Sequence, residues 1–371
     1  MSKLEDFYKG KTVLVTGHTG FKGSWLTIWL SQLGANVIGY SLEPPSSPSN
    51  FEACNLKERF ESIIGDVRDQ EKLREVFNKF NPDIVFHLAA QAIVRHSFND
   101  PIDTFSVNVM GTINILEVSR LTKSVKAVIS ITSDKCYLNK GWEWGYRESD
   151  ELGGYDPYSS SKACAELAIA CYSDNRFQNA AVNPRTLHIA SVRAGNVIGG
   201  GDWAVNRIIP DIVRSIVSKQ DIVIRSPNAT RPWQHVMEPL SGYLWLGINI
   251  FEEPEKYASA WNFGPHETEI KKVKNIVDNI LNLWDPKYTK LIIDEDCSGA
   301  ESKLLSLDCA KARHKLNWRA TWSIDETLDA IVSWYKNYYS STGVDSYEMV
   351  QMQISQYSES ARLRGLPWAQ K

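Results

Sequence analysis

The sequence lacks any apolar run near the roughly 20 residues that a membrane-spanning helix requires. Its first residues, MSKLEDFYKGK, are too polar to be the apolar core of a secretory signal peptide. An excess of one charge is also missing, because 41 Lys and Arg stand against 44 Asp and Glu, for a net charge of −3. A general nucleic-acid binder or a protein of acidic membranes would need a basic excess. We therefore expect a cytoplasmic protein without a nucleic-acid or membrane partner.

Cysteine is scarce and scattered. The six cysteines form no C-x-x-C pair and have no histidine cluster beside them. We expect neither a disulfide framework nor a metal site, because buried, reduced thiols explain such a pattern. The chain does have 43% hydrophobic and 23% charged residues over 371 positions, the balance of a globular protein with room for two or three domains.

The first half of the chain alternates short apolar runs with helical patterns. Runs rich in Val and Ile predict buried strands at 12–16, 35–40, 83–88, 127–132 and 186–193, and the segments between them predict helices at 24–33, 70–80 and 107–121. This alternation predicts an α/β fold of the Rossmann type, with a doubly wound parallel sheet covered by helices on both faces.

After about Gly195 the elements become shorter and turn signals more frequent. A short strand is expected at His235–Val236, and helices are expected from about Glu238 and at 270–283 and 324–339. We assign residues 1–190 to a dinucleotide-binding Rossmann domain with a return segment near 235–265. Residues 191–234 and 266–371 are assigned to a smaller, mixed α/β substrate-binding domain.

A glycine-rich turn follows the first predicted strand directly. Gly17, Gly20 and Gly23 are spaced G-x-x-G-x-x-G, which differs from the G-x-G-x-x-G of many dehydrogenases. Such turns also occur without ligands, but this one lies where a strand meets a helix N-terminus. Backbone N–H groups and the helix dipole favour a pyrophosphate there. No Lys or Arg occurs from residue 35 to 56 to accept a 2′-phosphate, so NAD is the predicted cofactor.

A tyrosine and a lysine open a predicted helix. Tyr158 and Lys162 are four residues apart and share one helix face. A nearby ammonium stabilises tyrosinate, so Tyr158 is a candidate general base toward a substrate hydroxyl. Chance pairs at this spacing usually mark a solvated face. Here, however, Ser133 follows a predicted parallel strand, where α/β proteins bind ligands, and it would share the hydroxyl with Tyr158.

Several segments together resemble a known family. They are TGHTGFKG, Asp66-Val67, LAAQ at 88–91, Asn108, Ser133 and Tyr158-x-x-x-Lys162, followed by TSDKCY, RAGNVIGGGDW and RPWQHVMEPLSGYL. The first group resembles the extended short-chain dehydrogenase/reductase superfamily, and the second resembles the nucleotide-sugar 4,6-dehydratases within it. The resemblance covers nearly the whole chain.

The resemblance implies roles for individual residues. The pyrophosphate of NAD would be faced by Gly17, Gly20, Phe21 and Gly23, the adenine by Asp66 and Val67, and the rest of the cofactor by Leu88, Ala89, Ala90 and Asn108. Lys162 would hold the nicotinamide ribose and lower the pKa of Tyr158. The nucleotide sugar would be held by Asn196, Arg207 and Arg231, with Arg225, Asn262 and Glu301 as weaker candidates. Arginine suits a diphosphate because its planar fork donates two hydrogen bonds at once, although a surface ion pair is the alternative.

The residues after Ser133 separate groups within the family. The dehydratases of dTDP-sugars carry Asp-Glu where this chain has Asp134-Lys135, and the lysine marks the group that acts on CDP-sugars. The resemblance implies oxidation at C4, loss of water across C5 and C6, and hydride return to C6. It also implies a homodimer or dimer of dimers. The product would lie on a route to deoxysugars of bacterial surface polysaccharide (lipopolysaccharide O-antigen). Whether Asp134 or Lys135 is the base at C5 stays open. Another nucleotide-sugar dehydratase, a nucleotide-sugar 4-epimerase and a non-catalytic NAD-binding protein are the alternatives.

Overall fold

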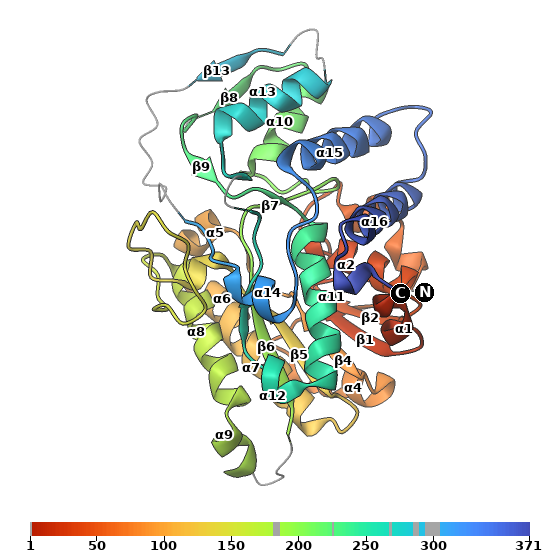
Figure 1. Cartoon of the computed structure of the whole chain (residues 1–371), viewed down its shortest axis with the longest axis vertical. Helices are drawn as coiled ribbons and strands as arrows, with labels where there is room; N and C mark the ends of the chain where they lie inside the picture. The colour runs from red at the N-terminus through yellow and green to blue at the C-terminus, as the bar shows by residue number, and fades with distance from the viewer. Residues whose placement is uncertain (1, 181–185, 225, 267–268, 285–288, 294–304) are drawn as a thin grey trace.

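A seven-stranded parallel sheet forms the centre of the computed structural model (Figure 1). The structure describes residues 2–180, 186–224, 226–266, 269–284, 289–293 and 305–371. The strand order is β11-β6-β5-β4-β1-β2-β3, and all neighbours are parallel. The strands are β1 (Thr12–Thr16), β2 (Asn36–Ser41), β3 (Glu61–Ile64), β4 (Ile84–His87), β5 (Ala127–Ile131), β6 (His188–Arg193) and β11 (Ala260–Asn262). The predicted Rossmann-type sheet is therefore confirmed, and its order reverses beside β1.

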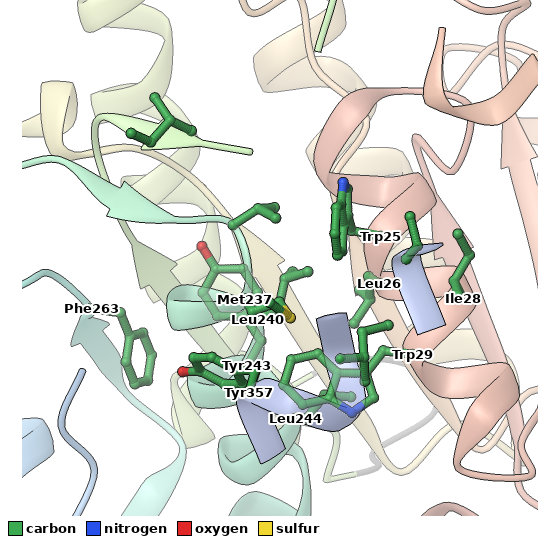
Figure 2. Packing of buried hydrophobic residues seen from close by; sticks show 14 of the residues in the cluster. Trp25, Leu26, Ile28, Trp29, Met237, Leu240, Tyr243, Leu244, Phe263 and Tyr357 are labelled. Atoms are coloured by element: carbon green, nitrogen blue, oxygen red, sulfur yellow. The ribbon is translucent and has the colours of Figure 1, made fainter. Parts of the chain in front are cut away.

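Each face of the sheet buries its own core, because side chains alternate along a strand. Val13 and Val15 of β1 face a large cluster, whereas Leu14 faces the opposite one. The first face is covered by α1 (Lys3–Tyr8), α2 (Phe21–Gln32) and α11 (Met237–Glu252), and the second by α4 (Gln70–Phe80), α7 (Gly111–Leu121) and α8 (Pro157–Ser173). Figure 2 shows how side chains of α2, such as Trp25 and Trp29, approach those of α11.

A second group of elements lies beyond one end of the sheet (Figure 1). It comprises α10 (Ile208–Val217), α13 (Val273–Trp284) and α15 (Ile324–Tyr338), with three small sheets that pair β7 (Val197–Ile198) with β10 (Gln234–His235), β8 (Ile222–Ile224) with β13 (Leu291–Ile293), and β9 (Thr230–Arg231) with β12 (Lys271–Lys272). Between β10 and β12 the chain returns to the central sheet and forms α11 and β11. Both elements lie within residues 235–265, the segment expected to return.

Shorter elements connect these units. They are α3 (Asn50–Ala53), α5 (Val94–Asn99), α6 (Pro101–Phe105), a π-helix (Ser106–Met110), a 3₁₀ helix (Asp134–Cys136), α9 (Asn175–Ala180), α12 (Pro254–Tyr257) and α14 (Ala310–Lys315). Within the described ranges, no helix combines the length and the apolar character needed to cross a membrane.

The C-terminal helix packs on the first unit, although the sequence assigned residues 266–371 to the second. Helix α16 (Ser346–Leu363) lies against α2, where the ring of Trp29 meets Tyr357 at 5.8 Å and Trp368 at 5.9 Å between centroids. The backbone N–H of Lys3 donates to the carbonyl of Gln370 at 2.9 Å, so the two ends of the chain lie together (Figure 1). Burial of these aromatic rings explains the return.

Candidate functional site

The candidate site lies at the carboxyl edge of the sheet. Gly17 follows β1, Leu88 follows β4, and Ser133 lies just beyond β5. These strands are neighbours at the point where the strand order reverses, which is where open α/β sheets bind ligands. Segments that are far apart in the sequence therefore meet at one edge.

The glycine-rich turn can be built only from glycine at two positions. Gly17 has a φ of +75°, and a Cβ there would lie 2.7 Å from the backbone nitrogen of Ala89. A Cβ on Gly23 would lie 2.0 Å from the Gly17 carbonyl oxygen. Gly20, by contrast, would meet only that oxygen, at 3.3 Å, and no side chain caps the N-terminus of α2 behind it. An uncapped helix N-terminus beside open space fits the pyrophosphate of a dinucleotide.

The turn also carries a residue that the sequence analysis missed. Lys22, in the first turn of α2, has its pKa lowered to about 8, first by burial and then by the charges of Arg207 and Lys162, while Asp134 acts in the opposite sense. These couplings place Lys22 at the junction of the turn and the candidate catalytic groups. A cation at a helix N-terminus is unfavourable because it opposes the helix dipole. This unusual position could have marked Lys22 as a candidate site residue in the sequence.

At the proposed adenine end, Asp66 is tied to its neighbour. Arg68 donates to both carboxylate oxygens of Asp66, at 2.6 to 3.0 Å, and also to Asp103 at 2.7 Å. These side-chain hydrogen bonds lower the pKa of Asp66. Val67 is buried, and a Cβ on Gly111 would lie 2.6 Å from it. The loop after β3 is therefore held in one conformation.

Asn108, a candidate cofactor residue, uses its side chain for hydrogen bonds within the protein. Its Oδ1 accepts from the backbone N–H of Gln91 at 2.8 Å, and its Nδ2 donates to the Gln91 carbonyl at 3.0 Å and to Ser161 Oγ at 2.9 Å. Asn108 therefore joins the loop after β4 to α8. It positions Leu88, Ala89 and Ala90, which are half-buried at the sheet edge.

The candidate catalytic residues converge from β5 and α8. Ser133 Oγ donates to Asp134 Oδ1 at 3.0 Å and also accepts a side-chain-capping bond from the backbone N–H of Lys135 at 3.2 Å. Ser133 lies close enough to Tyr158 to lower the pKa of that phenol. Tyr158 and Lys162 are both buried on α8, one turn apart. The structure thus packs the 3₁₀ helix that carries Asp134 and Lys135 against α8, although Ser133 and Tyr158 are 25 positions apart in the chain.

In the chain by itself, burial and not Lys162 dominates the pKa of Tyr158. Burial raises the pKa of Tyr158 to about 12, and the nearby Ser133 and the charge of Arg207 only partly oppose it. Burial also lowers the pKa of Lys162 to about 8, against the charge of Glu166. Desolvation penalises both charged forms, and it is the largest effect on the pKa of each group.

On the substrate side, Arg207 is the residue that reaches the catalytic groups. It precedes α10, and its Nη1 donates to Asp202 Oδ2 at 2.9 Å. Asn196 lies between β6 and β7 with a φ of +51°, and Arg231 lies on β9 with its Nη1 donating to the Thr230 carbonyl at 2.9 Å. Arg225 and Glu301 lie outside the described residues.

The side chain of Asn262, a candidate substrate residue, is hydrogen-bonded within the protein. It is fully buried at the end of β11, where its Oδ1 accepts from the Tyr137 hydroxyl at 2.8 Å. Its Nδ2 donates to the carbonyls of Tyr146 at 2.8 Å and Asp308 at 3.1 Å. Because every polar atom of the side chain is bonded within the protein, Asn262 anchors the loop after β5.

Comparisons with known proteins extend these observations. An epimerase structure from Methanothermobacter thermautotrophicus has a TM-score of 0.76 at 24% identity, covering 95% of this chain and 97% of that one. A dTDP-glucose 4,6-dehydratase from Bacillus anthracis in complex with NAD has a TM-score of 0.70 at 20% identity, covering 88% and 97%. The CDP-glucose 4,6-dehydratase of Salmonella typhimurium is 49% identical over 95% of this chain and 98% of its own length. Residues 14–331 match the family model described as GDP-mannose 4,6 dehydratase, and the chain belongs to that family.

Proposed function

We propose that this chain is an NAD-dependent lyase that converts CDP-D-glucose to CDP-4-keto-6-deoxy-D-glucose and water. The observation that carries the proposal is the 49% identity, over nearly the full length, to a CDP-glucose 4,6-dehydratase. The pair Asp134-Lys135 supports the same substrate group, because the sequence resemblance associates this pair with CDP-sugars. The protein is proposed to work in the cytoplasm.

The residues at the sheet edge fit NAD. The uncapped N-terminus of α2 at Gly20 would hold the pyrophosphate, and Lys162 would hold the nicotinamide ribose. When bound, NAD supplies the acceptor for the C4 hydride and returns that hydride at C6.

Tyr158 and Ser133 act in the oxidation at C4. Because Ser133 and Tyr158 are neighbours at the sheet edge, both can contact the C4 hydroxyl of the sugar, and Tyr158 removes its proton. The proton leaves more easily when positive charge is near the phenol. Arg207 supplies such a charge, since it lowers the pKa of Tyr158.

Asp134 and Lys135 act in the elimination. The 4-ketone acidifies the C5 proton, and one of the two residues removes it while the other protonates the departing C6 hydroxyl. The C5–C6 double bond forms as the C6–O bond breaks, and the protonated C6 hydroxyl leaves as water. When the hydride returns to C6, the residue that removed the C5 proton gives it back to C5. Ser133 holds Asp134 toward this step through its 3.0 Å hydrogen bond.

A nucleotide-sugar 4-epimerase is the rival function, since it needs Tyr158 and Lys162 but no acid–base pair for elimination. The test is incubation of the NAD-loaded protein with CDP-, dTDP-, GDP- and UDP-glucose. We expect a 4-keto-6-deoxy product with CDP-glucose. A 4-epimer without a keto product would establish the rival, and no turnover with any sugar nucleotide would favour a non-catalytic NAD-binding protein.

Two variants separate the half-reactions. Tyr158→Phe should abolish C4 oxidation, so no reduced cofactor forms in a single turnover. Lys135→Met keeps the length of the side chain but removes the proton carrier, so the 4-keto-glucose intermediate should accumulate while deoxy product falls by about 10²–10⁴-fold. Near-normal deoxy product from Lys135→Met would show that Lys135 has no role in elimination.

A homodimer or dimer of dimers is also proposed. It is supported by exposed apolar side chains on neighbouring elements of one flank, where α6 and α8 lie (Figure 1). Ile102 is 82% exposed and Leu167 is 61% exposed. Light scattering should give a mass of two or four chains, and a monomer at micromolar concentration would refute this assembly.

A further inference from the structure

A small cavity adjoins the buried carboxylate of Asp134. Its polar walls are Asp134, Gln234 and Ser306, and apolar walls include Ile270 and Leu307. The space open to the centre of a water molecule is about 20 Å³. One water needs roughly 10–15 Å³ by this measure and two or more polar partners. The cavity therefore has the size and the lining for a single water molecule.

Gln234 lines this cavity and carries an unused acceptor. Its Nε2 donates to two backbone carbonyls, those of Gly195 at 3.1 Å and Phe263 at 3.1 Å. Because both partners can only accept, the orientation of the amide is fixed. Its Oε1 is buried and has no hydrogen-bond partner among the described residues, in a side chain that is 2% exposed. Buried carbonyl oxygens without a donor are rare, so this one calls for a donor that is not a protein group.

Asp134 carries a second acceptor, which lies against Gly195, another residue of the cavity wall. Its Oδ1 accepts from Ser133, whereas its Oδ2 points to Gly195, where a Cβ would lie only 1.9 Å away. The buried hydroxyl of Tyr243 also lacks a partner among the described residues, and the charge of Asp134 adds to burial in raising the pKa of that phenol. The carboxylate is thus held between Ser133 on one side and the cavity on the other.

We propose that the cavity holds one water molecule that donates its two hydrogens to Gln234 Oε1 and Asp134 Oδ2. Two acceptors at one cavity match the two donors of a water molecule. Gln234 is then a positioning residue: through this water it fixes the Asp134 carboxylate, while Oδ1 and Ser133 stay turned toward the sugar. The role in elimination rests on the proposed dehydratase function, whereas the water site itself does not.

The first test is a high-resolution structure of the NAD-bound enzyme, alone and as the Tyr158→Phe variant with CDP-glucose. We expect a water oxygen within hydrogen-bond distance of Gln234 Oε1 and Asp134 Oδ2 in both. A dry cavity, or the C6 hydroxyl of the sugar in place of the water, would overturn the proposal. This readout stands even if the chain acts on another sugar nucleotide.

The second test asks whether the water serves elimination. Gln234→Met removes the amide oxygen, and Ser306→Leu fills the cavity without changing Gln234 or Asp134. Both should lower formation of deoxy product by about 10- to 100-fold, the cost of a misplaced catalytic group, with little change in KM. Because C4 oxidation does not depend on the water, the 4-keto-glucose intermediate should accumulate.

The control is Gln353→Met on α16. Gln353 is equally buried, donates to the Ala330 carbonyl at 2.8 Å and also has an unpartnered Oε1, but it lies on a helix outside the site. It should lose stability without accumulating the intermediate. If Gln234→Met slows oxidation and elimination alike and lowers only the melting temperature, Gln234 is merely structural and the proposal fails. Absence of keto product from the wild type would instead refute the proposed function.

Discussion

A buried ion pair behind the catalytic helix offers a sharp test of what holds that helix in place. Glu166 lies one turn beyond Lys162 on α8, and it accepts from Arg193 Nε at 2.9 Å and Arg193 Nη2 at 2.7 Å. Ser191 Oγ donates to the same carboxylate at 2.7 Å, as does the hydroxyl of Thr132. Both charged side chains are 3% exposed. The pair therefore clamps α8 to the ends of β5 and β6.

Removal of one partner should be far more damaging than removal of both. Arg193→Met leaves the Glu166 carboxylate buried with only hydroxyl donors, a change that costs about 3–5 kcal/mol. For a chain of 371 residues the unfolding entropy is about 0.8 kcal/mol per degree, so the melting temperature should fall by about 4–6 °C. The double variant Glu166→Leu/Arg193→Met should lose less than Arg193→Met alone, because apolar replacements of a buried pair are often neutral.

The assay is thermal and urea unfolding of the cofactor-free protein, with Arg120→Met as the matched control. Arg120 also pairs bidentately with a glutamate, Glu117, but near the surface of α7. Its loss should cost less than about 1 kcal/mol. The reasoning is refuted if Arg193→Met lowers the melting temperature no more than Arg120→Met does. It is also refuted if the double variant loses as much stability as Glu166→Leu and Arg193→Met lose in sum.

Three further predictions concern pH, substrate and cofactor. Burial raises the pKa of Glu238 to about 7, above the usual 4.5. The wild type should therefore lose about 3 kcal/mol of stability as pH rises from about 4.5 to 7, whereas Glu238→Gln should not. Parallel urea titrations at pH 5 and 8 would test this difference. Arg231→Ala should raise KM roughly ten- to hundredfold with little change in kcat, and an unchanged KM would assign Arg231 to a structural role. Cofactor-depleted protein should regain activity with NAD, and equal rescue by NADP would show that the absence of basic residues at 35–56 was misinterpreted.

The sequence predicted the sheet well where strands are buried on both faces. The run at 12–16 became β1 without any change of bounds, because Val13, Leu14 and Val15 are all buried and uninterrupted. Strand β3 was not predicted, since Glu61–Ile64 is a short edge strand with exposed residues at both ends. Helix α16 was missed because its sequence is mostly polar and it is fixed by aromatic rings from distant segments.

At the site, the spacing of residues along the chain could be interpreted from the sequence, whereas contacts between distant residues could not be predicted. The four-residue spacing of Tyr158 and Lys162 predicted one helix face, and α8 begins at Pro157 as such a helix. No spacing could show that the amides of Asn108 and Asn262 are used within the protein, because their partners come from other parts of the chain. The pKa of Tyr158 likewise depends on desolvation, which exists only in the folded chain.

The same limit applies to charge. The chain as a whole is slightly acidic, yet it gathers positive charge around Lys22. The charges of Lys162 and Arg207 lower the pKa of Lys22, and the charge of Asp134 raises it. Both proposed ligands, a dinucleotide and a nucleotide diphosphate sugar, carry negative charge, and a cleft of one sign concentrates the opposite charge. Burial lowers the pKa values of Lys22 and Lys162 to about 8. Both side chains therefore still carry mostly positive charge at neutral pH. An anionic ligand would raise both pKa values, and its binding should therefore take up protons above about pH 8.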